Sequence, residues 1–79
     1  MKIVKLFKPA CNPCQLVENY LQARSVEHDS INLMEAPEVA AEYRVMSAPV
    51  TLLLNEEGIE VTRSIGFKPD ELEEMIEQL

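Results

Sequence analysis

The sequence predicts one α/β domain, residues 1–79, in which a single mixed four-stranded sheet has helices on both faces. Three observations lead to this class. Short apolar, β-branched runs alternate with stretches of helical apolar spacing, in the order β-α-β-α-β-β-α. The first β-α-β unit requires a parallel strand pair with a right-handed crossover, whereas the last two strands are close enough in the chain to form a hairpin. The chain has 79 residues and 47% hydrophobic content, which suffices for one modest core and leaves no room for two.

The first half of the chain is predicted to form two strands and one helix. The apolar run over residues 2–7 is expected to be a buried strand. A helix is predicted over residues 12–23, and Pro13 fits its first turn, where the missing N–H would have no helical partner. Its apolar face is formed by Leu16, Val17, Tyr20 and Leu21. Residues 26–33 are expected to form a second, less apolar strand.

The second half is predicted to form a short helix followed by a hairpin. The helix begins at Pro37, and its inward-facing residues are Val39, Ala40 and Tyr43. Residues 50–55 give the strongest strand signal in the chain, and Gly58 supplies a turn residue that tolerates a positive φ. In the strand over residues 59–64, the alternation is expected to bury Ile59 and Val61.

The chain is predicted to end in an amphipathic helix. Pro69 lies early in this helix, and Asp70 and Glu71 fall in its first turn, where the helix dipole favours acidic residues. Apolar residues at helical spacing form its buried stripe, namely Leu72, Met75, Ile76 and Leu79.

The charge of the chain narrows the function classes. A net charge of −7 argues against nucleic acid and anionic membrane surfaces as partners. No stretch approaches the roughly 20 apolar residues that cross a bilayer, and the opening lacks a signal-peptide pattern, so a cytoplasmic protein is expected. The first 26 residues nevertheless hold four basic residues against Glu18 alone, and this basic end also contains both cysteines. The excess is either ordinary solvated surface or a set of cations that helps to hold a thiolate.

Both cysteines lie in the stretch CNPC at residues 11–14. Cys11 falls at the junction of the first strand and the first helix, where free N–H groups and the helix dipole favour an anion. The pKa of Cys11 should therefore lie below the value of about 8.5 of a free thiol. Cys14, one turn later, can attack a mixed disulfide formed by Cys11 and release the reduced substrate. The pair predicts thiol–disulfide exchange.

Other roles for the two cysteines are less favoured. A disulfide at this spacing closes almost no loop, so it contributes little to stability. A zinc site normally needs four ligands, and beyond the cysteine pair the chain offers only His28 as a nitrogen ligand, so no metal is expected. Two unreactive core thiols would more plausibly be scattered along the chain. His28 is interpreted as a surface residue without a role. Pro49, at the start of the central strand, would by base rate be a trans proline.

The stretches CNPC, SAPVTLLL and SIGFKPDEL on this element order resemble the thioredoxin superfamily over essentially all 79 residues. The resemblance implies a thioredoxin-like fold in which the bond before Pro49 is cis. It further implies that the backbone of Ala48 pairs with an extended substrate segment, that Gly66 leaves room for that segment, and that Phe67 borders the groove. Lys8 matches a basic residue with which many glutaredoxins meet the glutathione carboxylate.

Within the superfamily the compact size is similar to that of glutaredoxins and NrdH-redoxins, and residues 66–70 resemble a Gly-Phe-basic-Pro-Asp signature of the latter. The Thr-Val-Pro and Gly-Gly steps typical of glutaredoxins are absent. Lys5 stands where thioredoxins keep a buried aspartate as a proton relay, so that relay is not expected here.

The resemblance implies a monomeric dithiol–disulfide oxidoreductase that acts as an electron carrier. Its redox group would be the disulfide between Cys11 and Cys14, with no separate cofactor. Thioredoxin reductase would be the electron donor, and protein disulfides, including that of ribonucleotide reductase, would be the recipients. Two alternatives stay open: a glutathione-dependent glutaredoxin, and a thioredoxin-like interaction module whose exchange activity is incidental.

Overall fold

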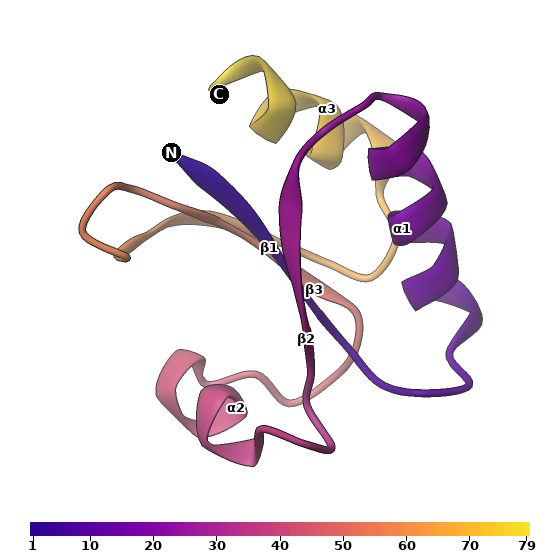
Figure 1. The fold of residues 1–79 in the computed structure, drawn as a ribbon, viewed down its shortest axis with the longest axis vertical. Helices are drawn as coiled ribbons and strands as arrows, with labels where there is room; N and C mark the ends of the chain where they lie inside the picture. The colour runs from indigo at the N-terminus through magenta and orange to yellow at the C-terminus, as the bar shows by residue number, and fades with distance from the viewer.

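A computed structural model describes all 79 residues and confirms the predicted order of elements (Figure 1). The elements are β1 (Lys2–Phe7), α1 (Asn12–Ala23), β2 (His28–Asn32), α2 (Pro37–Tyr43), β3 (Val50–Leu54), β4 (Glu60–Ile65) and α3 (Pro69–Glu77). The second strand is shorter than the predicted 26–33, because the Val26 N–H donates to the Leu21 carbonyl of α1 and a turn begins at Leu33. None of the three helices is long and apolar enough to span a bilayer.

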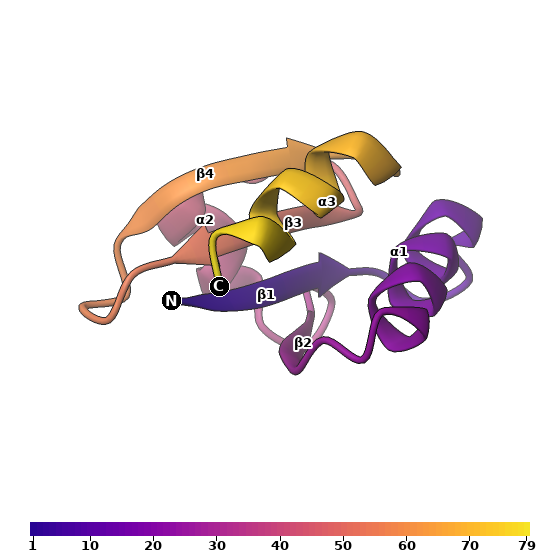
Figure 2. The same ribbon diagram turned by 90° about the horizontal axis from the view of Figure 1, so that it is seen from above.

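The four strands form one mixed sheet in the order β2-β1-β3-β4. β1 and β2 are parallel, as a β-α-β unit requires, whereas β3 is antiparallel to both β1 and β4. Helix α2 lies on the opposite side of the sheet from α1 and α3 (Figures 1 and 2). The sheet with helices on both faces is therefore confirmed.

Alternating residues of the two central strands divide the core into two layers. On one face, Ile3 and Leu53 pack against α1 and α3, together with Val17, Leu21, Leu72 and Met75. On the other face, Val4 and Leu52 belong to a second cluster, against which α2 packs Val39, Ala40 and Tyr43. The inward face predicted for α2 is thus confirmed.

The edge strand β4 shows the opposite alternation to the one predicted. Ile59 and Val61 are exposed, whereas Ser64 is fully buried. Ile59 precedes β4, and Val61 falls where the pairing with β3 shifts register between Leu53 and Leu54. Ser64 lies on the face that α3 covers, where its Oγ donates to Glu71 Oε1 at 2.7 Å. Apolar character in an edge strand therefore did not identify its buried face.

Two apolar residues predicted to line buried helix faces are also exposed. Leu16 of α1 is 48% exposed, although Val17 and Leu21 beside it are fully buried. Leu79 follows the end of α3 at Glu77 and is 53% exposed, because the helical spacing stops before it. The turn prediction for Gly58 is confirmed by its φ of +78°.

Candidate redox site

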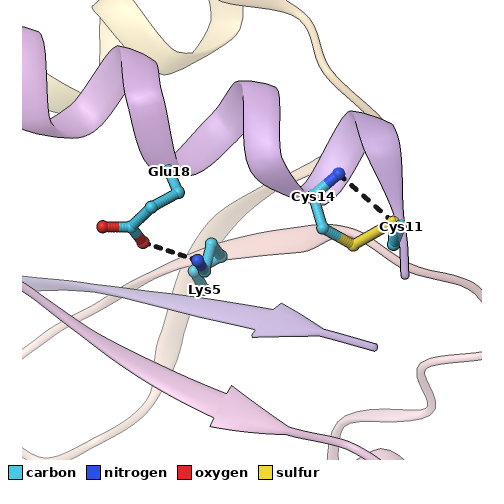
Figure 3. The surroundings of a disulfide bond; sticks show 4 residues. All are labelled: Lys5, Cys11, Cys14 and Glu18. Carbon is cyan, nitrogen blue, oxygen red and sulfur yellow. Dashed lines mark hydrogen bonds and ion pairs between the residues drawn. A yellow bond between two sulfur atoms is a disulfide. The ribbon is translucent and has the colours of Figure 1, made fainter. Parts of the chain in front are cut away.

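The cysteine pair lies at the start of α1, directly after the loop that follows β1 (Figure 3). Cys11 is the N-cap residue, with extended backbone angles, and its Sγ accepts a hydrogen bond from the Cys14 N–H at 3.2 Å. The two residues form a disulfide, with their Cα atoms 5.2 Å apart. Cys11 is partly exposed, whereas Cys14 is only 3% exposed. One sulfur is therefore open to a partner, and the other is shielded from solvent.

The start of α1 favours negative charge on Cys11. Pro13 has no N–H, and the Cys14 N–H is directed at the Cys11 sulfur. The first turn holds no acidic side chain that would compete for this position. Because the unpaired N–H groups and the helix dipole both attract an anion, a thiolate on Cys11 is stabilised when the disulfide is reduced.

A surface hollow of about 490 Å³ adjoins the disulfide. Both cysteines line it, as do two lysines, the half-buried ring of Phe7, and the loop that joins β1 to α1. Lys8 is exposed at this hollow, whereas Lys5 reaches it from the buried strand β1. The positive charge of the N-terminal region is thus partly collected around the disulfide, while Lys2 is bound to Asp29 elsewhere.

The other predicted substrate-binding residues gather at the same edge of the sheet. Strand pairing sets Leu6 at the end of β1 opposite Val50 at the start of β3, and Val50 opposite Ile65 at the end of β4. The loop before Cys11, the Ala48–Pro49 step and Gly66 therefore leave the sheet at one edge.

Within this group the Ala48–Pro49 bond is cis, as the resemblance implied. The Gly66 N–H donates to the Pro49 carbonyl at 2.9 Å, and the φ of Gly66 is +82°. The Phe67 ring packs edge-on against Tyr20 of α1, with 6.3 Å between ring centroids. Ala48, Pro49, Gly66 and Phe67 do not line the hollow that contains Lys8.

A buried charge cluster beneath α1 was not predicted from the sequence. Lys5 Nζ donates to Glu18 Oε1 at 2.5 Å, and His28 Nε2 lies 2.9 Å from the same oxygen (Figure 3 draws the Lys5–Glu18 pair). The interpretation of His28 as a surface residue was therefore wrong, since its side chain is only 8% exposed. A lysine in the middle of an apolar strand, and a carboxylate one turn after Cys14, were the signals available.

The pKa of Glu18 reflects this cluster. Partial burial acts to raise its pKa, but hydrogen bonds from Lys5, His28 and Gln22 outweigh burial and hold the pKa at about 2. Glu18 is therefore a carboxylate throughout the neutral pH range. No group of three or more histidine, cysteine or acidic side chains is placed so that it could hold a metal ion.

Comparison with known proteins places the chain in a family. No family model matches the sequence. The SPbeta prophage-derived thioredoxin-like protein YosR of Bacillus subtilis (strain 168) is 47% identical over 79 residues, which cover 100% of this chain and 99% of that protein. The chain belongs to the thioredoxin superfamily. A thioredoxin of Staphylococcus epidermidis is 31% identical over 77 residues, covering 90% of this chain and 73% of that protein.

Solved structures agree with this assignment. The crystal structure of the thioredoxin NaTrxh from Nicotiana alata superposes with a TM-score of 0.85 at 36% identity, covering 96% of this chain and 70% of that one. The fold is accordingly a thioredoxin fold with three helices and a mixed four-stranded sheet. With the Cys11–Cys14 pair in place, this thioredoxin-like protein is a thiol–disulfide oxidoreductase whose redox-active disulfide belongs to the chain itself.

Proposed function

We propose that this thioredoxin-like protein is a dithiol electron carrier that reduces disulfides of other proteins. The observation that supports the proposal most directly is the contrast between its two sulfurs. Cys11 is partly exposed at the N-terminus of α1, and Cys14 is buried one turn later. An exposed sulfur that is stabilised as a thiolate attacks, and a shielded sulfur within reach resolves.

In the reduced protein, the Cys11 thiolate attacks one sulfur of a substrate disulfide. A bond forms between Cys11 and that sulfur, and the second substrate sulfur departs as a thiolate and takes up a proton. Cys14 then loses its proton and attacks Cys11, which forms the Cys11–Cys14 disulfide and releases the first substrate sulfur as a thiolate. Two electrons have moved from the protein to the substrate.

The substrate segment is proposed to lie along the edge formed by Ala48, Pro49, Gly66 and Phe67. Ala48 is half-buried and precedes the cis bond, so its backbone is available to an extended chain as a short added strand. An added Cβ on Gly66 would meet no atom within 4 Å, which is consistent with open space beside it. Phe67 borders this space and is held by Tyr20.

The electron donor is proposed to be an NADPH-dependent thioredoxin reductase, because the relatives of this chain are thioredoxins. The resemblance of residues 66–70 to NrdH-redoxins supports ribonucleotide reductase as one recipient. The cytoplasm, where reductases keep thiols reduced, is the compartment in which such a cycle would operate.

A glutathione-dependent glutaredoxin is the second candidate, and one observation favours it. Lys8 lies at the same hollow as Cys11, where a basic side chain could meet the carboxylate of glutathione. The two candidates differ in their electron donor, and one experiment separates them.

We expect NADPH to be consumed when the protein is combined with a thioredoxin reductase and a disulfide substrate. The parallel assay uses glutathione with glutathione reductase, and both reductases should come from the source organism because their recognition is selective. Turnover with thioredoxin reductase alone supports the proposal. Turnover with glutathione alone would make Lys8 a ligand contact and overturn it.

Gly66 offers a test of the substrate edge, with Gly58 as its matched control. Both glycines have a positive φ, at +82° and +78°, and an added Cβ meets no atom within 4 Å at either position. Replacing either by alanine is therefore expected to lower the free energy of unfolding by a similar amount, about 1 kcal/mol, through backbone strain alone. Only Gly66→Ala is expected to raise KM for a protein disulfide, since Gly58 lies in the distant hairpin turn. Thermal melts and steady-state kinetics on both variants measure this, and equal KM values would remove Gly66 from the substrate edge.

A further inference from the structure

A buried row of polar side chains lies on the face of the sheet that α1 and α3 cover. Strand pairing sets Lys5 opposite Thr51, and Thr51 opposite Ser64, so the three side chains share that face. Each is more than nine-tenths buried. Ser64 donates to Glu71, whereas Thr51 Oγ1 has no hydrogen-bond partner within the protein. Lys5 is the charged member of this row.

Lys5 is costly to bury at this position. An ammonium group removed from water needs a close counter-charge, which Glu18 supplies at 2.5 Å. Its Nζ also lies 4.8 Å from the centroid of the Phe7 ring. An apolar residue at this position would extend the cluster around Ile3 without the free-energy cost of burying a charge. Packing alone therefore does not account for a lysine here.

Lys5 lies close to the resolving cysteine. Cys14 and Glu18 are four residues apart on α1, so they share one face of the helix, and Lys5 approaches that face from β1 below. Figure 3 shows Lys5 beneath α1, with Glu18 on one side and the disulfide on the other. Lys5 and Cys14 also line the same hollow, which Glu18 and His28 do not. Of the buried pair Lys5 and Glu18, only the positively charged Lys5 therefore shares the hollow with Cys14.

The charged side chains of the buried cluster and of the hollow beside Cys14 come from β1, α1, β2 and the loop after β1. They are Lys5 from β1, Glu18 from α1, His28 from β2 and the exposed Lys8 from the loop after β1. His28 Nδ1 lies 3.0 Å from the Val26 carbonyl, and its Nε2 faces the Glu18 carboxylate.

We propose that Lys5 supplies the positive charge that stabilises the Cys14 thiolate in the resolving step. This role rests on the function proposed above and makes Lys5 a positioning residue for disulfide exchange. Cys14 releases its proton to solvent through the hollow, its thiolate forms a bond to Cys11, and the bond between Cys11 and the substrate sulfur breaks. The departing substrate thiolate takes a proton from solvent, so the proton count and the two electrons balance. Lys8, which is exposed, has a weaker effect because water screens it.

The test is a pH titration of Cys14 alone, which requires no substrate and is therefore independent of the electron-carrier proposal. In a Cys11→Ser background, the ultraviolet absorbance of the thiolate reports Cys14, and a variant lacking both cysteines gives the baseline from the two tyrosines. Lys5→Met removes the charge at similar size, Lys5→Arg keeps it, and Lys2→Met removes the same charge from an exposed site on the same strand. A double variant, Lys5→Met with Glu18→Gln, removes the buried pair as a unit and guards against misfolding of the single variant.

We expect Lys5→Met to raise the midpoint of the Cys14 titration by about one pH unit or more. The double variant should lie between Lys5→Met and the parent, and Lys5→Arg and Lys2→Met should titrate close to the parent. The proposal fails if the Cys14 midpoint of Lys5→Met equals that of Lys2→Met, or if the midpoint of the double variant lies at or below that of the parent. In either case the buried pair has only a structural role. Where Lys5→Met does not fold, the double variant alone decides, since only a net positive influence on Cys14 raises its midpoint.

Discussion

Replacing Cys11 by serine is expected to abolish disulfide reduction, lowering turnover by on the order of a thousand-fold or more. A serine hydroxyl stays protonated at neutral pH, so the N-terminus of α1 has no anion to stabilise and no nucleophile faces the substrate. Replacing Cys14 by serine is expected to leave the first attack intact and to prevent the second. The mixed disulfide between Cys11 and the substrate should then accumulate, because no thiolate remains to displace it.

The two variants control for each other. Oxidation of NADPH with a reductase measures turnover, and mass spectrometry without reductant detects the trapped species. Both replacements are nearly isosteric, so a trapped adduct in Cys14→Ser also establishes that the start of α1 still folds without the disulfide. If Cys11→Ser instead captured partner proteins as well as the parent does, the interaction-module alternative would replace the electron carrier.

The sequence was sufficient where local chemistry determines structure. CNPC predicted Cys11 at the start of a helix and Cys14 one turn later, because a helix start and a spacing of one turn are local properties. The order of strands and helices followed from apolar periodicity, and the parallel β1–β2 pair followed from the crossover rule. The cis bond before Pro49 is different, since it was expected only from the family resemblance.

Predictions failed where the outcome depends on contacts between distant segments. Ile59 and Val61 alternate as a half-buried strand would, yet both are exposed, because Ile59 precedes β4 and Val61 falls at the register shift between β3 and β4. His28 was interpreted as a surface residue because nothing near it in sequence suggests a partner. Its contact with Glu18 arises only when α1 packs over the parallel strands β1 and β2. Long-range pairing of this kind is not encoded in local pattern.

Acid is expected to remove a measurable part of the stability through Glu18 alone. Its pKa is about 2 in the folded protein against 4.5 for an unperturbed glutamate, so the folded state holds the carboxylate more strongly than the unfolded state does. The stabilisation is complete above about pH 4.5 and is lost as the pH falls toward 2. Because the Glu18 side chain is 19% exposed and therefore largely sheltered, its size is on the order of 2–3 kcal/mol.

Glu18→Gln separates this contribution from those of the other thirteen acidic residues. Chemical denaturation of the oxidised protein between pH 7 and pH 2 gives the free energy of unfolding of both forms. At neutral pH the variant should be less stable, since Lys5 keeps its burial and loses its counter-charge. As the pH falls, the parent protonates Glu18 and loses the same ion pair, so the two curves should converge. Parallel curves would mean that Glu18 has the same pKa in the folded and the unfolded protein. The buried pair would then contribute nothing to acid sensitivity. Convergence would instead establish that the cluster beneath Cys14 holds its charges in the folded state.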